Sequence, residues 1–198
     1  MEVTLAPSTS TTTLSVSPAS VRYGQPATAT VTVTGGSWAP SGAVTIRERD
    51  KVLGTADLTV DELTGTATVE LPRDLATGTH RLVAEFAGTT DVEASQAGAQ
   101  LRVTPAPAAV TLAADDWTVP RGSTPTVTVR VGGGEGAPAA TGRVTVLLGL
   151  RSLGTYRLTD GAASVTLPAV RSTGVLTVLY GGGGGYLPGA AAQVVRVG

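Results

Sequence analysis

The 198-residue chain carries one sequence unit twice. The run Gly42-Ala43-Val44-Thr45-Ile46 returns as Gly142-Arg143-Val144-Thr145-Val146, and Leu53-Gly54-Thr55 returns as Leu153-Gly154-Thr155. Later, Val69-Glu70-Leu71-Pro72 returns as Val165-Thr166-Leu167-Pro168. The spacing between copies changes only within Gly-, Asp- or Thr-rich stretches, which indicates that insertions lie in loops and that the matched blocks are structural elements. The chain is therefore predicted to be a duplicated domain.

Within each block the residues alternate with period two. Ala29, Val31 and Val33 fall on one side of an extended chain, and Thr30 and Thr32 fall on the other. Such alternation is typical of antiparallel sheets with one buried and one solvated face. Abundant β-branched residues favour strands, and no segment has helical periodicity with a cap.

Seven strands are predicted in each copy, which is typical of a Greek-key β-sandwich. In the first copy they fall at 12–17, 27–34, 42–48, 51–59, 65–71, 80–86 and 97–103. In the second they fall at 110–114, 125–131, 142–148, 151–158, 162–167, 175–180 and 191–197. We therefore expect a sandwich over 1–104 with a polar leader at 1–11, an extended Pro/Ala linker at 105–109, and a second sandwich over 110–198.

Composition excludes several functions. The charges nearly cancel, to a formal net of −1, so the basic face that nucleic acid requires is missing. The sequence contains no run of 18 apolar residues, the length needed to span a membrane. It also contains no Cys, which excludes disulfides and thiolate metal sites. The sequence begins without a signal peptide, which fits a trimmed piece of a longer exported protein.

The ordered blocks resemble a known family, the bacterial immunoglobulin-like (Ig-like) repeat domains of large actinobacterial surface and secreted proteins. The resemblance runs from Thr11 to Val197 over both copies. It rests on the following marks: Gly24 and Gly122 before the second strand, the Gly-x-Val-x-[Ile/Val] and Leu-Gly-Thr blocks, the stretch from Leu71 to His80, and Phe86-Ala87-Gly88 with Tyr180-Gly181-Gly182. The family often continues with Asp, where this chain has Thr89 and Gly183. The resemblance implies an all-β fold of two tandem Ig-like sandwiches and an extracellular or cell-wall setting.

No catalytic, cofactor or metal site is predicted. His80 is the only histidine and is expected to be a surface or edge residue, so no triad can form around it. The acidic pairs Asp61-Glu62 and Asp115-Asp116, and the fragment Asp91-x-Glu93, are expected to be solvated turn residues, not a calcium site. A Lys–Asn isopeptide cross-link is excluded because the chain has one Lys and no Asn. The polar run from Ser8 to Thr13 is expected to fray.

Two tryptophans are the candidate ligand-binding residues. Trp38 lies in the loop after the second strand, where an exposed indole could stack on a sugar ring, and Trp117 lies beside Asp115-Asp116. The competing interpretation of Trp38 is a lid over the end of the sandwich, because large apolar side chains are seldom left exposed.

The sequence as a whole favours a non-enzymatic structural spacer, or stalk, in a larger secreted or cell-surface protein. Its partners would be other domains of the same polypeptide. The alternatives are a binding or adhesion module that contacts cell-wall polysaccharide or a surface protein through its loops, and a virion or appendage decoration domain.

Overall fold

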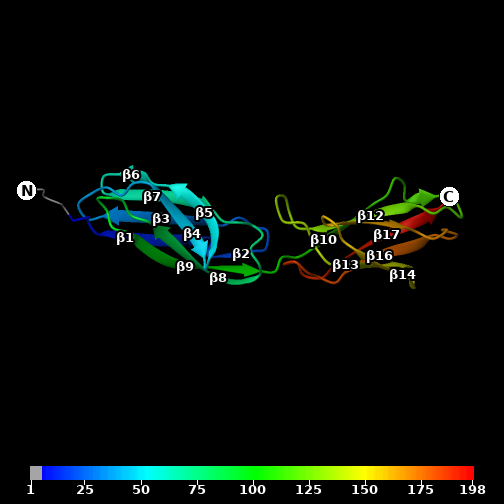
Figure 1. Cartoon of the computed structure of the whole chain (residues 1–198). Coiled ribbons are helices and arrows are strands. Elements are labelled where there is room, and N and C mark those ends of the chain that lie inside the picture. Colours follow the sequence, from blue (N-terminus) through cyan, green and yellow to red (C-terminus); the bar gives the residue numbers. More distant parts are fainter. Residues whose placement is uncertain (1–5) are drawn as a thin grey trace, which may run out of the picture. The chain divides into compact units, whose positions relative to one another are not determined.

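The structure is a computed structural model, and it describes residues 6–198. The chain divides into two compact units, Met1–Thr104 and Pro105–Gly198, and the described residues contain strands and no helix. Each unit is built from two sheets (Figure 1). The predicted all-β fold of two sandwiches is confirmed.

Nine strands lie in residues 6–104, the described part of the first unit. One sheet has the order β1-β3-β7-β6 and the other has the order β2-β9-β8-β4-β5. Their bounds are β1 Ser10–Ser17, β2 Ser20–Arg22, β3 Thr28–Gly35, β4 Ala43–Glu48, β5 Lys51–Asp57, β6 Thr59–Asp61, β7 Thr64–Glu70, β8 Gly78–Phe86 and β9 Ser95–Thr104.

The second unit repeats this arrangement with eight strands. A three-stranded sheet has the order β10-β12-β15, and a five-stranded sheet has the order β11-β17-β16-β13-β14. The bounds are β10 Ala109–Ala113, β11 Thr118–Val119, β12 Thr126–Gly132, β13 Arg143–Leu148, β14 Arg151–Arg157, β15 Ala162–Thr166, β16 Gly174–Tyr180 and β17 Gly189–Val197.

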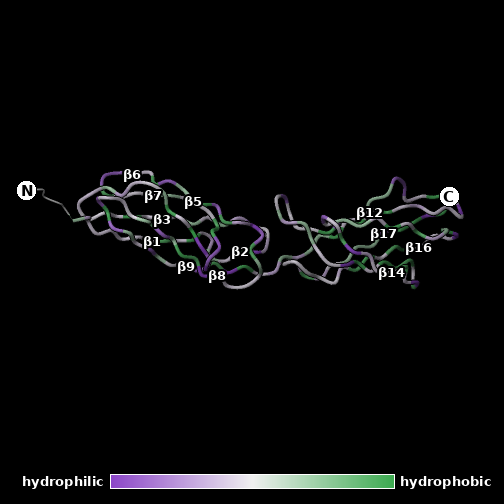
Figure 2. Tube along the Cα trace, in the orientation of Figure 1, coloured by the Kyte–Doolittle hydropathy of each residue, from purple (hydrophilic) through white to green (hydrophobic). Residues whose placement is uncertain are grey.

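The core of each unit follows the alternation in the sequence. Val31 and Val33 are fully buried between the sheets of the first unit, while Thr30 and Thr32 are only partly covered. Figure 2 shows apolar and polar residues alternating along the strands. The burial of every second residue supplies most of the stabilising free energy, at roughly 25 cal/mol per Å² of apolar surface.

Three short strands were not predicted: β2, β6 and β11. Strands β2 and β11 arise because the chain changes sheet after the first strand of each unit. Strand β1 pairs antiparallel with β3, whereas β2 pairs parallel with the last strand β9. In the second unit β11 pairs parallel with β17 in the same way. Two or three residues are too few to show a period, so this crossing has no sequence signature.

The polar segment from Ser8 to Thr13 is not frayed, and that expectation was wrong. Strand β1 begins at Ser10, and the backbone of Ser8 forms hydrogen bonds of 2.8 Å with Asp91 and Glu93. The Ser10 hydroxyl lies 2.5 Å from the hydroxyl of Ser95, within hydrogen-bond distance. Serine and threonine residues can form an edge strand as well as apolar residues can. The polarity of this segment therefore did not indicate disorder. Of the predicted leader, residues 1–5 lie outside the described part of the chain.

Residues 105–109, predicted as a linker, lie in the second unit. Ala106 is buried, its N–H donates to Gly185 O at 3.0 Å, and its carbonyl accepts from Leu187 N at 2.8 Å. Strand β10 already begins at Ala109. The Pro-Ala-Pro composition therefore marks an extended segment that is held by backbone hydrogen bonds.

Candidate functional sites

The loop that carries Trp38 is held in place by its backbone. Gly35 N donates to Leu63 O at 2.8 Å, and Ser37 N donates to the Ser8 hydroxyl at 2.7 Å. A Cβ at Gly35 would overlap the carbonyl oxygen of Trp38, so glycine is required where the loop folds back. The Trp38 side chain is 53% exposed. About half of Trp38 is therefore accessible to solvent.

Trp117 has a different environment. Its side chain is half-buried, and its carbonyl accepts from Arg196 N at 2.7 Å, which joins it to β17. The neighbouring Asp116 carboxylate accepts from Thr118 N at 2.8 Å and so caps the turn that leads into β11. The structure thus places one candidate tryptophan in each unit, with Trp38 the more accessible.

The acidic pairs occupy exposed positions at turns. Asp61 and Glu62 lie at the turn between β6 and β7, and Asp115 and Asp116 precede β11. Among residues 6–198 no three His, Cys, Asp or Glu side chains are grouped closely enough to hold a metal ion. The carboxylates are dispersed, and each is available to solvent.

His80 is buried, contrary to the prediction of a surface or edge residue. Only 8% of it is exposed, its Nδ1 lies 2.9 Å and 3.0 Å from the two carboxylate oxygens of Glu48, and its Nε2 donates to Ala76 O at 2.7 Å. Burial alone would lower the pKa of His80. The hydrogen bonds to Glu48 and Ala76, and the negative charge of Glu48, outweigh that effect and raise the pKa above its usual 6.5.

This buried pair was missed because the partners lie 32 residues apart. Strand β4 ends with Glu48 and β8 carries His80 near its start, so only sheet pairing brings them together. Its arrangement is structural, since His80 holds the loop before β8 through Ala76. In the second unit the equivalent residues are Leu148 and Gly174, and the Leu148 side chain packs over the glycine.

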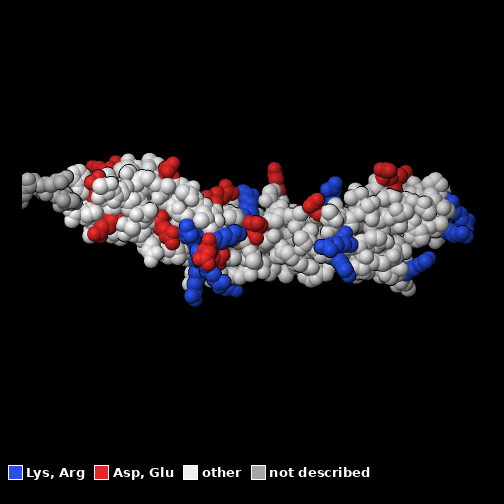
Figure 3. Space-filling view, in the orientation of Figure 1, with Lys and Arg blue, Asp and Glu red and all other residues white. Residues whose placement is uncertain are grey.

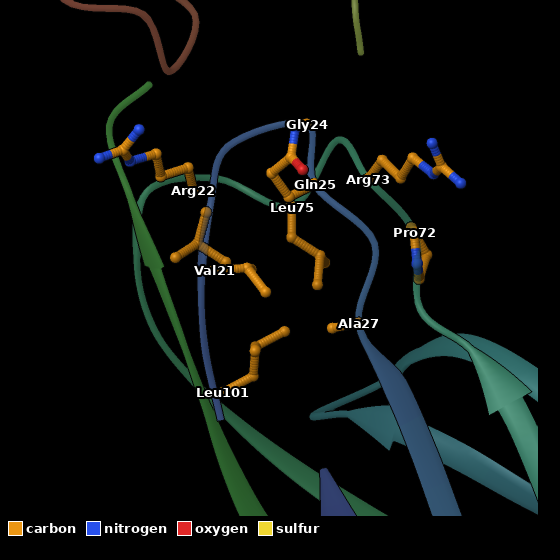
Figure 4. A pocket seen from close by; sticks show the side chains of 10 residues that line it. Val21, Arg22, Gly24, Gln25, Ala27, Pro72, Arg73, Leu75 and Leu101 are labelled. Atoms are coloured by element: carbon orange, nitrogen blue, oxygen red, sulfur yellow. The ribbon is translucent and has the colours of Figure 1, made fainter. Parts of the chain in front are cut away.

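The cavities offer no enclosed ligand site in the described residues. One lies at the end of the first unit's core, where Val21, Leu75 and Leu101 point toward one another (Figure 4). Its volume is about 10 Å³, room for one water at most. A larger hollow of about 330 Å³ beside Asp115 and Asp116 is open to solvent. Any macromolecular ligand would therefore bind on a surface.

The comparison with known families finds a match for the first of these two sandwiches. Residues 14–104 match the family described as bacterial Ig-like domain (group 3). The first unit is thus similar to that family over nearly its whole length, as the resemblance of its motifs implied. The match covers the first copy, and the second is related to it through the internal repeat. No curated protein matches the chain.

Several solved structures are similar to both units at low identity. The fibronectin(III)-like modules of Clostridium thermocellum CbhA share 16% identity over 93% of this chain and 94% of that chain, with a TM-score of 0.34. The Yersinia pseudotuberculosis adhesin InvE shares 18% over 92% and 58%, with a TM-score of 0.43. Titin-A168169 shares 18% over 90% and 92%, with a TM-score of 0.45. Likenesses of this size carry no information on function.

Proposed function

We propose that the chain is a non-catalytic spacer module of a larger extracellular or cell-surface bacterial protein. The observation that carries this proposal is the position of the chain ends within each unit. In both sandwiches the polypeptide enters at one end and leaves at the other, so each unit adds its own length to the path of the chain.

In the first unit, the start of β1 lies at the start of β9. The Ser10 hydroxyl donates to Glu93 O at 2.7 Å and lies 2.5 Å from the Ser95 hydroxyl. Strand β9 then runs ten residues to Thr104, where the unit ends. At about 3.3 Å per residue, entry and exit are about 30 Å apart.

The second unit repeats this design. Ala106 is hydrogen-bonded to Gly185 and Leu187, just before β17 begins at Gly189. Strand β17 runs nine residues to Val197 at the other end of the sandwich. A module that must separate two neighbours requires this arrangement, since adjacent termini would add almost no length.

The pairing of the terminal strands also suits a module under tension. Because β2 and β9 are parallel, a pull on the two ends of the first unit slides one along the other and loads their hydrogen bonds together. Strands β11 and β17 are loaded in the same way. Shear of this kind resists force better than opening bonds one at a time.

Single-molecule force spectroscopy of the full chain, held at its two ends, tests the proposal. Two separate unfolding peaks are expected, each releasing about 300 Å of contour for some 90 residues. A chain that extends at low force without peaks would rule out a load-bearing spacer.

Exposed Trp38 supports a second candidate function, a binding module for cell-wall polysaccharide. Aromatic rings at loop tips stack on sugar rings, and 53% of this residue is accessible. Intrinsic fluorescence during titration with purified cell-wall polysaccharide tests it. This candidate is supported if the parent chain shows saturable binding that Trp38→Ala abolishes and Trp117→Phe leaves intact. The absence of binding by the parent chain counts against it.

A further inference from the structure

The five-stranded sheet of the second unit has an apolar outer face. We define the apolar face by five residues that point away from the core or lie at the hairpin tip: Leu147, Leu150, Val175, Leu179 and Val194. The register aligns them, since Leu179 pairs with Thr145, Leu147 with Thr177, and Val175 with Val194. Leu150 is fully exposed, at 104%, and Val175 and Leu179 are each 45% exposed.

The equivalent surface of the first unit is polar. The same register pairs Thr45 with Glu85, Arg47 with Val83, and Arg81 with Gln100. Arg47 also forms an ion pair of 3.0 Å with Glu85. The residues that replace the apolar face are, in the same order, Arg47, Asp50, Arg81, Glu85 and Gln100. The fold therefore does not require an apolar surface here, and the largest apolar patch on a monomer, typically about 300–600 Å², is often functional.

The charges at one end of this face also differ between the units. In the second unit Arg143 and Arg157 lie directly opposite each other on β13 and β14, both exposed. In the first unit the same pair is Ala43 and Asp57. No acidic side chain among the described residues is ion-paired with either arginine. Two like charges placed opposite each other destabilise a sheet unless something else neutralises them.

The first unit carries a surface of the opposite charge. We call it the acidic tip and define it as Trp38, Val60, Asp61, Glu62 and Leu63, all exposed. The hydrogen bond from Gly35 N to Leu63 O holds the turn between β6 and β7 beside the loop of Trp38. The second unit has no equivalent tryptophan and only Asp160 at the matching turn.

The charge balance of the two units is opposite as well. Residues 1–104 contain eleven Asp and Glu against seven Lys and Arg, whereas residues 105–198 contain four against seven. Figure 3 shows acidic and basic side chains scattered over the visible surface of the second unit, with wide uncharged areas between them. The chain thus has one acidic and one basic unit, and each presents exposed apolar side chains next to its charges.

We infer that the apolar face is the docking site for a second copy of this chain, bound through its acidic tip. Asp61 and Glu62 of one copy would neutralise Arg143 and Arg157 of the other. Trp38, Val60 and Leu63 would cover the exposed leucines and valines. Since both surfaces occur in every chain, the contact is heterologous and can continue from copy to copy.

Charge complementarity favours the acidic tip of a second copy over the simplest alternative partner, which is the apolar face of a second copy. The same face of a second copy offers arginines and no acid, so face-to-face packing would bring like charges together. The face is also small: four strands at about 4.8 Å spacing and about five residues each cover some 300 Å². Stable interfaces bury about 800 Å² per partner, so the association is weak and depends on charge.

Sedimentation velocity of the full chain across a concentration series tests the inference. The weight-average sedimentation coefficient is expected to rise with concentration at low salt and to rise less at 0.5 M salt, where the charges are screened. Leu150→Glu/Leu179→Glu should abolish the rise, as should Asp61→Arg/Glu62→Arg and Arg143→Glu/Arg157→Glu. Val52→Glu, at an exposed site on β5 outside both surfaces, should leave it unchanged.

A mixing experiment makes the test specific. Each charge-reversed variant should be monomeric alone, and an equimolar mixture of the Asp61→Arg/Glu62→Arg and Arg143→Glu/Arg157→Glu chains should associate again. Circular dichroism melts confirm that every variant is folded. A parent chain that stays monomeric at all concentrations overturns the inference. So does association that survives reversal of the tip or strengthens with salt, because either result indicates packing between apolar faces.

Discussion

His80 and Glu48 form a buried ion pair in which every polar atom of the imidazole is used. Nδ1 lies 2.9 Å from one Glu48 carboxylate oxygen, and Nε2 lies 2.7 Å from Ala76 O. A carbonyl and an ionised carboxylate oxygen can only accept, so this arrangement favours the positively charged ring, in which both nitrogens carry protons, and it raises the pKa of His80. The pair thus joins the end of β4 to β8 and to the loop before it.

The stability of the first unit is expected to fall as the pH rises. The folded pKa of His80 lies above the unfolded value, so its contribution is complete below pH 6.5 and is lost as the pH rises through the folded pKa. Because His80 is the only histidine, NMR titration of its ring protons gives the pKa without assignment. A folded pKa at or below 6.5 would contradict the prediction.

Glu48→Gln supplies the control for this pair. The amide keeps the size of the side chain and removes the charge, so the pKa of His80 should fall and the unfolding free energy at pH 6 should drop by about 1.5–3 kcal/mol. The same substitution at exposed Glu70, whose partner Arg73 lies on the surface, should change stability by less than about 1 kcal/mol.

Gly54→Ala is expected to destabilise the first unit. A Cβ at Gly54 would overlap Cγ1 of buried Val69, a stiff β-branched side chain that cannot rotate away. The expected loss is about 1–3 kcal/mol in urea unfolding. Gly98→Ala is the matched control, because its Cβ would meet nothing closer than Leu82 O at 3.6 Å. Equal effects of the two substitutions would refute the steric explanation.

Tyr180→Phe is expected to weaken the second unit alone. The phenol oxygen lies 2.8 Å from Thr141 O and 2.9 Å from Gly183 O and shares its one proton between these two carbonyls, and so holds the glycine-rich loop after β16. The first unit has Phe86 at this position. We expect a loss of about 0.5–1.5 kcal/mol. Urea unfolding followed by Trp117 fluorescence in a Trp38→Phe background isolates the second unit, and an unchanged midpoint would show that the loop needs no such support.

The two units are expected to fold as separate fragments, provided that the second begins at residue 105. A fragment of residues 110–198 lacks Ala106 and therefore loses its hydrogen bonds to Gly185 and Leu187. Its melting temperature should be about 4–8 °C lower than that of 105–198 for each kcal/mol lost. Equal melting temperatures would mean that residues 105–109 contribute nothing to the second unit.

Removal of divalent metal is expected to leave stability unchanged, because the described carboxylates do not converge. Differential scanning calorimetry should give the same midpoints with EDTA and with millimolar Ca²⁺. A rise of several degrees with calcium would reveal a bound ion through its linkage to folding.

The strands and the two-domain repeat could be predicted from the sequence because their signals are local or repeated. Alternation of Thr with Val or Ala in β3 indicates a half-buried strand whatever the partner, since side chains on a strand alternate between faces. All of these features are encoded within a few residues.

Only the tertiary structure decided which residues meet across the sheets. Burial of His80 depends on Glu48, the crossing of the chain to β2 depends on β9, and the position of Ala106 depends on a loop some 80 residues later. The outer faces show the same limit. Arg47 and Leu147 occupy equivalent strand positions, but Arg47 forms an ion pair with Glu85, whereas Leu147 pairs with Thr177. Alternation assigns each residue to a face, but the partner on that face is set by long-range pairing, which a local pattern does not contain.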